Sequence, residues 1–303
     1  METKIIQLFG VAETQEIEKT FIEVLKEFSQ KEIREKCLKP STAEKHGYFI
    51  QNVERFLKKE NKEGILPGEV RIKLMEEMQL WLQTSFHNCK PGHASRHAKL
   101  CRGAMGYAVR MEYVEHNPLS EIKLMRDKVK DVVSLEINEL NTLINGDLKK
   151  KIKYVTALFL QTIDLYIFQC YTGLSYGDLY TYSLIKKDGR LWIENRRNKN
   201  NKPYYVPLFK QAEVIHNKYN GKLPRVTNQA YNKTLKRVAK EWGIDKILTT
   251  HTARKTFATH RDAEGWSTKT ISDMLGNTLE IVQKHYLAKS SRRTENELVR
   301  LGL

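Results

Sequence analysis

The sequence has few cysteines and no long hydrophobic run. Its four cysteines, Cys37, Cys89, Cys101 and Cys170, form no C-x-x-C pair. Such sparse cysteines predict no disulfide framework and favour a reducing compartment. No apolar stretch approaches the roughly eighteen residues that a membrane-spanning helix needs, and the first ten residues lack a signal-peptide pattern. We therefore expect a soluble protein of the cytoplasm that does not enter a membrane.

Acidic residues are also scarce relative to basic ones. The chain has 36 Asp and Glu residues against 52 Lys and Arg residues, a formal net charge of +16. This sign of charge favours a polyanionic partner, because each phosphate contact releases counterions. Charge alone does not separate DNA from RNA or from an anionic membrane surface. The hydrophobic content of 40% and the length of 303 residues fit a globular chain with two domains.

The most informative stretch lies near the C-terminus. His251 and Arg254 are three residues apart, which places both side chains on one face of a predicted helix. A second helix is predicted to end at Gly276, in a left-handed cap, directly before Asn277. Tyr286 follows nine residues later, on another short helical run. A guanidinium suits two phosphodiester oxygens, and a phenol can attack phosphorus to form a covalent ester. These residues predict chemistry that breaks and rejoins DNA strands.

The stretch contains H-x-x-R, then LG followed by a polar residue, then a tyrosine nine positions on. In this order the motifs resemble those of the tyrosine recombinase (phage integrase) family. The resemblance implies that Tyr286 attacks the scissile phosphate and leaves a 3′-phosphotyrosyl link. It also implies that Arg254 holds the non-bridging oxygens, that His251 assists proton transfer, and that no metal or other cofactor takes part. Asn277 stands where the family has histidine or tryptophan, and its amide can still donate to phosphate. The alternative is a basic helical domain with an ordinary buried tyrosine.

A second motif, TGLSYGDL, matches the family pattern T-G-L-R-x-x-(D/E)-L except that Ser175 replaces the arginine. Loss of one such electrostatic donor typically costs about 10²–10³ in rate. Either another arginine supplies the charge, or the protein is an impaired DNA-binding relative that regulates recombination. Asp178 fits the acidic position, which in the family orients a histidine behind the site. A helix-start acid favoured by the dipole is the alternative for Asp178.

Residues 181–208 alternate in polarity and contain turn signals, which predicts three short antiparallel strands. The resemblance implies that Lys199, in the loop between two of these strands, protonates the leaving 5′-oxygen. Arg197 lies two residues earlier, so we expect it on the same strand face, where it can replace the missing arginine. We expect Lys202 to contact phosphate without a catalytic role.

The first half of the chain predicts about four helices, beginning at Phe21, and resembles the SAM-like core-binding domain of the family. A long helix is expected from His93 to His116. Arg96, Lys99 and Arg102 near its start are expected to contact DNA phosphates, since a helix start adds its dipole and free amides. A solvated charged face is the alternative. A later helix adds Arg237 to the expected DNA contacts.

The sequence also contains helix-capping signals and one set of metal-binding residue types at helical spacing. Segment 40–42, Ser134 and Thr227 are expected to cap the helices that follow them. His93, His97 and Cys101 lie at i, i+4 and i+8, and this spacing spans two full turns, too far for one tetrahedral zinc ion. We therefore expect no metal site.

The expected organisation is mainly α with a small antiparallel sheet. It comprises a polar lead-in at 1–20, a helical core DNA-binding domain at 21–122, a linker at 123–133 and an α/β catalytic domain at 134–303. The tail at 292–303 either docks on a neighbouring protomer or packs on its own domain. The resemblance implies a site-specific integrase of a mobile element, which acts on double-stranded DNA as a homotetramer in the cytoplasm, with the nucleoid. Accessory DNA-bending proteins are possible partners.

Overall fold

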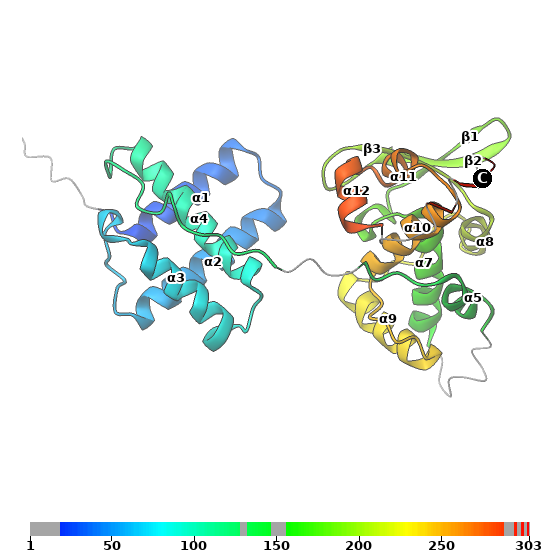
Figure 1. The fold of residues 1–303 in the computed structure, drawn as a ribbon, viewed down its shortest axis with the longest axis horizontal. Coiled ribbons are helices and arrows are strands. Elements are labelled where there is room, and N and C mark those ends of the chain that lie inside the picture. The colour runs from blue at the N-terminus through cyan, green and yellow to red at the C-terminus, as the bar shows by residue number, and fades with distance from the viewer. Residues whose placement is uncertain are drawn as a thin grey trace, which may run out of the picture. The chain divides into compact units, whose positions relative to one another are not determined.

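The computed structural model describes residues 19–127, 132–146 and 156–287, with isolated positions 294, 295, 298, 299 and 302 in the tail. The chain divides into two compact units between Val129 and Lys130 (Figure 1). Each unit buries its own hydrophobic cluster, so each has an independent core. The lead-in before residue 19 and most of the tail lie outside the described residues.

Within residues 19–127, four α-helices and two single turns form the first unit. Thr20 caps the first helix in a reciprocal capping box with Glu23, which satisfies the free amides at the helix start. The elements are α1 (Phe21–Glu35), α2 (Pro40–Lys59), a 3₁₀ turn (Pro67–Glu69), α3 (Ile72–Trp81), a π turn (Leu82–Phe86) and α4 (Pro91–Arg110). The core collects apolar side chains from all four helices, among them Phe21, Leu25 and Phe28 on one face of α1.

Three predicted helix ends are wrong. The long helix begins at Pro91 and ends at Arg110, not at His93 and His116. Proline suits a first helical position because its fixed φ is already helical and its missing N–H is not needed there. Just after that helix, Glu112 takes a left-handed φ of 62°, which turns the chain away. Segment 40–42 caps nothing, because Pro40 is itself the first residue of α2.

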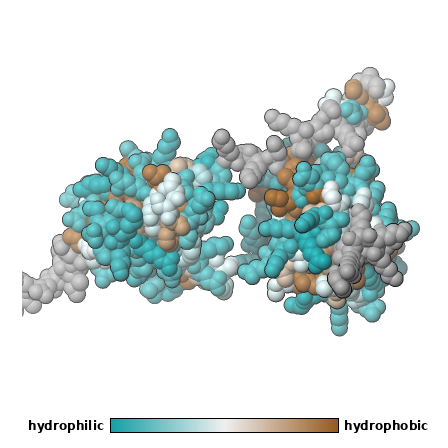
Figure 2. Space-filling model, turned by 90° about the horizontal axis from the view of Figure 1, so that it is seen from below, coloured by the Kyte–Doolittle hydropathy of each residue, from teal (hydrophilic) through white to brown (hydrophobic). Residues whose placement is uncertain are grey.

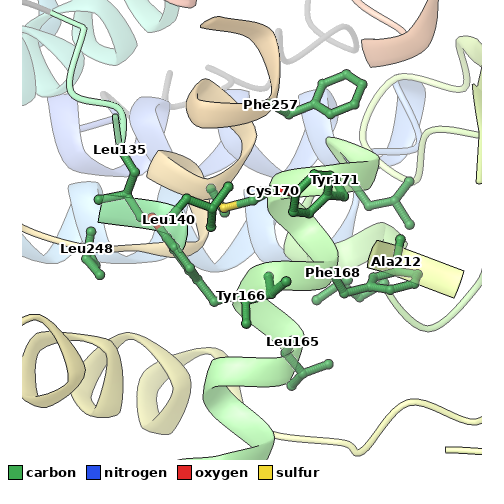
Figure 3. Close-up of a cluster of buried hydrophobic side chains, with 14 of the residues drawn as sticks. Leu135, Leu140, Leu165, Tyr166, Phe168, Cys170, Tyr171, Ala212, Leu248 and Phe257 are labelled. Carbon is green, nitrogen blue, oxygen red and sulfur yellow. The ribbon is translucent and has the colours of Figure 1, made fainter. Parts of the chain in front are cut away.

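The second unit is built around one apolar helix. Its elements are α5 (Ile137–Asn145), α7 (Ala157–Thr172), a 3₁₀ turn (Tyr176–Asp178), β1 (Ser183–Lys187), β2 (Arg190–Arg196), β3 (Pro203–Pro207), α8 (Lys210–Lys218), α9 (Asn228–Trp242), α10 (Thr250–Ala263), α11 (Thr268–Leu275) and α12 (Leu279–His285). Helix α7 contacts α5, α8, α9 and α10. Leu165, Tyr166 and Phe168 of α7 lie in the buried cluster that Figure 3 shows.

Two capping predictions in this unit have different outcomes. Thr227 caps α9, as predicted, by accepting from the Ala230 amide at 3.3 Å. Ser134 does not cap α5: the N-cap residue is Glu136, whose backbone amide donates to the Glu139 carboxylate at 2.7 Å. A carboxylate three residues into the helix reaches back to the free amide and moves the helix start by two positions.

The three strands form one antiparallel sheet in the order β1-β2-β3. Ile193 at its centre lies opposite Leu184 on one side and Val206 on the other. Ile193, Tyr204 and Val206 are buried, and α11 packs against β3 (Figure 1). The prediction of a mainly helical chain with a small antiparallel sheet is confirmed.

No helix in the described ranges is long and apolar enough to span a membrane. The face of each unit seen in Figure 2 is mostly hydrophilic, with small apolar patches.

Candidate active site

Tyr286 lies directly after α12 and is buried, with 6% of its surface exposed. Arg254 Nε donates to the Tyr286 hydroxyl at 3.3 Å. The His251 ring packs edge-on against the Tyr286 ring, with 5.4 Å between centroids. His251 and Arg254 share one face of α10, because they are three residues apart. Two helices thus bring an imidazole and a guanidinium to one phenol.

Backbone carbonyls fix the guanidinium of Arg254. Its two terminal nitrogens donate to the carbonyl oxygens of Gly173 and Leu275. Both acceptors stand at helix ends, where carbonyls have no partner within the helix. Gly173 has φ +66°, and a Cβ there would lie 2.6 Å from the Phe257 ring, so only glycine fits. Burial lowers the pKa of Arg254 to about 10, although Tyr286 acts in the opposite direction.

A second guanidinium lies beside the first. Arg197 is buried and donates to the same Leu275 carbonyl at 2.8 Å and to Asn277 Oδ1 at 3.2 Å. Its aliphatic chain passes over Gly276, where a Cβ would lie 2.8 Å from Arg197 Cγ. The left-handed cap at Gly276, with φ +55°, is therefore needed for space as well as for conformation.

Asp178 is the buried carboxylate that faces Arg197. Its Oδ2 lies 3.0 Å from Arg197 Nε, an ion pair in which the N–H is not aligned for a hydrogen bond. The same oxygen accepts from Ser175 Oγ at 2.5 Å, and Oδ1 accepts from the Asn198 amide at 2.9 Å. Among the described residues, no hydrogen bond joins Asp178 to a histidine. In this structure the charged partner of Asp178 is Arg197, and the expectation that Asp178 orients a histidine stays a prediction.

Lys199 lies in an exposed turn rather than on a strand. Strand β2 ends at Arg196, so the prediction that Arg197 and Lys199 share one strand face is wrong. The chain leaves the strand because Asn198 is anchored to the 3₁₀ turn, through its amide to Asp178 and through its side chain to the Gly177 carbonyl at 2.5 Å. Arg197 consequently turns inward, whereas Lys199 faces solvent.

The pKa of Tyr286 is lowered from its ordinary value. Burial alone raises it, but the charge and hydrogen bond of Arg254, with further contributions from Asn277 and Arg197, outweigh burial. The phenol is therefore easier to ionise than an isolated buried tyrosine.

The pKa of His251 is lowered to about 4. The residue keeps an exposed surface, yet burial against its neighbours is the first cause. Four nearby cations act in the same direction: Lys255, Arg254, His285 and Lys199. At neutral pH the imidazole is uncharged, so one ring nitrogen is free of a proton.

The residues expected to contact DNA differ in exposure. Arg96 and Lys99 are exposed on α4, and Arg102 is half-buried. Lys202 is also half-buried, at the end of the loop that carries Lys199. Arg237 is exposed on α9, where it lies over the Phe159 ring and 3.9 Å from Glu241.

The histidines of α4 serve packing. His97 Nε2 lies 3.1 Å from Asn52 Nδ2, and His97 Nδ1 lies 3.2 Å from the His93 carbonyl oxygen. Within the described ranges, no group of three or more His, Cys, Asp or Glu side chains is placed to hold a metal ion.

Sequence reasoning missed the groups that align the two arginines. The Leu275 and Gly173 carbonyls have no side-chain signature, and Asn198 was one polar residue among several in its loop. The left-handed glycines at both helix ends are the signal that marks those carbonyls.

Comparison with known sequences gives two family matches. Residues 134–293 match the phage integrase family, and residues 20–124 match the phage integrase SAM-like domain. Tyrosine recombinase XerD of Listeria monocytogenes is 29% identical over 126 residues, which cover 35% of this chain and 42% of that protein. XerD of Listeria innocua is 23% identical over 207 residues, or 62% of this chain and 68% of that protein.

Solved structures share the fold. The Tn1549 transposon integrase in complex with circular intermediate DNA has a TM-score of 0.64 at 14% identity, covering 91% of this chain and 99% of that one. The lambda integrase tetramer bound to a Holliday junction has a TM-score of 0.64 at 12% identity, covering 93% and 78%. The family match across the second unit, together with the motifs that meet at Tyr286, shows that this chain belongs to the phage integrase family.

Proposed function

We propose that this protein is a site-specific DNA recombinase, the integrase of a mobile element, that cuts and rejoins strands through a 3′-phosphotyrosine intermediate. The observation that carries the proposal is the hydrogen bond from Arg254 to the Tyr286 hydroxyl, together with the second buried guanidinium, that of Arg197, which shares the Leu275 carbonyl with Arg254. A phenol among guanidiniums is activated as a nucleophile, and the same cations attract the phosphate that it attacks.

The first step forms one bond and breaks another. Tyr286 Oη bonds to phosphorus, the bond from phosphorus to the 5′-oxygen breaks, and the phosphate stays on the 3′ end. The phenol proton passes to the neutral His251 imidazole, whose low pKa keeps a nitrogen available. Lys199 gives a proton to the departing 5′-oxygen, a contribution typically worth about 10²–10⁴ in rate. Attack by a 5′-hydroxyl on the phosphotyrosine reverses these changes and rejoins a strand.

The two arginines neutralise the charge that develops on the phosphate oxygens. Arg254 Nε donates to the Tyr286 hydroxyl, and Arg197 Nη1 donates to Asn277 Oδ1 beside it. The Asn277 amide adds a neutral donor beside them. Their backbone acceptors hold them in place before substrate arrives, which is what makes such donors effective.

The DNA partner is double-stranded and lies against both units. We propose a core-binding domain at 21–122, a linker at 123–133 and a catalytic domain at 134–303. Phosphate contacts come from Arg96, Lys99, Arg102, Lys202 and Arg237. A homotetramer on DNA is supported by the lambda integrase neighbour, and accessory DNA-bending proteins are part of the proposal. Leu298 and Val299 of the tail are exposed, 42% and 78%, and suit docking on a neighbouring protomer.

A suicide substrate, nicked so that the released 5′ fragment diffuses away, tests the function. Wild-type protein should accumulate a covalent DNA adduct, and peptide mapping should place it on Tyr286. Tyr286→Phe should form no adduct and keep DNA affinity, because only the phenolic oxygen is removed. Tyr205→Phe is the matched control, since Tyr205 lies on an exposed strand position. An adduct on Tyr286→Phe, or a wild type that binds DNA without any adduct, would favour a regulator that binds without cutting.

A further inference from the structure

The carboxylate of Asp178 is where residues 175 and 197 meet. Ser175 Oγ and Arg197 Nε both contact one oxygen, Oδ2, at 2.5 and 3.0 Å. The other oxygen is occupied by the Asn198 amide at 2.9 Å. The side chain at 175 therefore points at the place where the Arg197 guanidinium sits.

The negative charge of Asp178 can balance one buried guanidinium. Asp178 is 1% exposed, and in the described part of the chain it is the single buried carboxylate. Arg254 lies close by, and it adds a second buried positive charge. Its hydrogen-bond partners, two backbone carbonyls and the Tyr286 phenol, carry no negative charge to balance it. A second guanidinium on Asp178 would be buried without an anion of its own, which is strongly unfavourable.

Arg197 is held by more than this carboxylate. It donates to the Leu275 carbonyl and to Asn277, and it passes over the bare backbone of Gly276. The hairpin loop thus delivers the guanidinium from a distant part of the sequence into the space beside a short side chain at 175.

We propose that Ser175 determines which position of the chain supplies the second guanidinium. The serine leaves the space beside Asp178 open for Arg197 and keeps the carboxylate oriented through its hydroxyl. Arginine at 175 and arginine at 197 are mutually exclusive occupants of one position. This inference rests on the proposed strand cleavage, in which Arg197 neutralises the phosphate.

Single-turnover cleavage by four proteins tests the exclusion: wild type, Arg197→Ala, Ser175→Arg and the double variant. Arg197→Ala should lose about 10²–10³ in rate, the effect of one electrostatic donor. Ser175→Arg alone should also be slower than wild type, because two guanidiniums compete for Asp178. In the double variant the same Ser175→Arg change should raise the rate of Arg197→Ala at least about tenfold.

Two controls separate charge from bulk. Ser175→Met fills the space without charge, so it should slow the wild type and restore nothing to Arg197→Ala. A substrate with a methylphosphonate at the scissile position carries no charge there. The deficit of Arg197→Ala should shrink on that substrate, which a purely structural role for Arg197 would not produce.

Thermal unfolding gives a readout that does not depend on cleavage. Ser175→Arg should lower Tm in the wild type and should lower it much less when Arg197 is alanine. If Ser175→Arg cuts like wild type, and its Tm shift is the same in both backgrounds, the exclusion is overturned. If the wild type forms no adduct, the proposed function fails, and the two Tm shifts still decide the exclusion: unequal shifts support it and equal shifts overturn it.

Discussion

The buried polar groups of the two units differ in kind. In the first unit, those that the structure describes carry neutral polar groups, and two pairs of them bond to each other: Asn52 pairs with His97, and Ser95 donates to Gln79 at 2.6 Å. In the second unit the buried groups include three arginines, Arg197, Arg254 and Arg261, against one buried carboxylate. Neutral pairs cost little in a core, whereas an excess of buried guanidiniums opposes folding.

This difference in buried groups distinguishes residues that stabilise the fold from residues that take part in the proposed reaction. A core selected for stability alone replaces buried charge with apolar groups of similar volume. The second unit keeps two of these cations, Arg197 and Arg254, near Tyr286, where under the proposed function an incoming phosphate supplies the missing negative charge. The first unit has no such excess in the described residues, and its cations, including Arg96 and Lys99, lie on the surface.

The largest effect is expected when one buried cation of the second unit is removed. Arg254→Met should reduce cleavage by at least about 10²–10³, because its guanidinium contacts the nucleophile. The fold should survive, since the substitution also removes a buried charge. Single-turnover cleavage and thermal unfolding measure the two effects.

Arg261→Met is the matched control on the same helix. Arg261 is equally buried, but it lies over the Phe209 ring and donates to Glu264 at 2.5 Å. Its replacement should affect stability more than cleavage. Equal losses of cleavage in both variants would mean that the buried arginines act through the fold.

An exposed cation of the second unit provides the next test. Lys199→Ala should slow cleavage by about 10²–10⁴, because the 5′-oxygen then leaves without a proton. A substrate with sulfur at the bridging 5′ position needs no such proton and should cut at nearly the wild-type rate. Lys202→Ala should show the same defect on both substrates, since a phosphate contact does not depend on the leaving group. Failure of the sulfur substrate to rescue Lys199→Ala would rule out the general-acid role.

The smallest expected effect concerns acid stability of the first unit. Burial lowers the pKa of His97 to about 4, below the ordinary value of 6.5. Between these values the unfolded chain binds more protons than the folded one, so the free energy of unfolding falls as pH drops from 6.5 to 4. His97→Gln should flatten this dependence, measured by denaturant titrations across that range. His116→Gln, at an exposed position, should leave the slope as it is.

Much of the fold follows from local sequence, because the signals are local. Thr227 caps its helix, Gly276 ends another, and the period-two alternation of 181–208 forms the sheet. His251 and Arg254 share one face of α10 for the same reason, since the helix fixes their spacing.

The departures come from contacts between distant segments. Asn198 is drawn to the Gly177 turn, and this contact ends β2 at Arg196 and turns Arg197 inward. No periodicity in the hairpin encodes that turn, because the partner lies about twenty residues earlier in the chain. Ser134 does not cap α5, because the helix starts after Glu136, whose free amide donates to the Glu139 carboxylate.

The Leu275 carbonyl, which accepts from both Arg197 and Arg254, makes the site sensitive to length rather than to side-chain identity. Replacing a side chain of α11 leaves this oxygen in place, so scanning by substitution does not remove it. Inserting or deleting one residue in α11 moves the helix end by about 1.5 Å and turns it by roughly 100°. Both guanidiniums would then lose their common acceptor at once. The length of this eight-residue helix therefore affects the site more than the identity of most of its residues does.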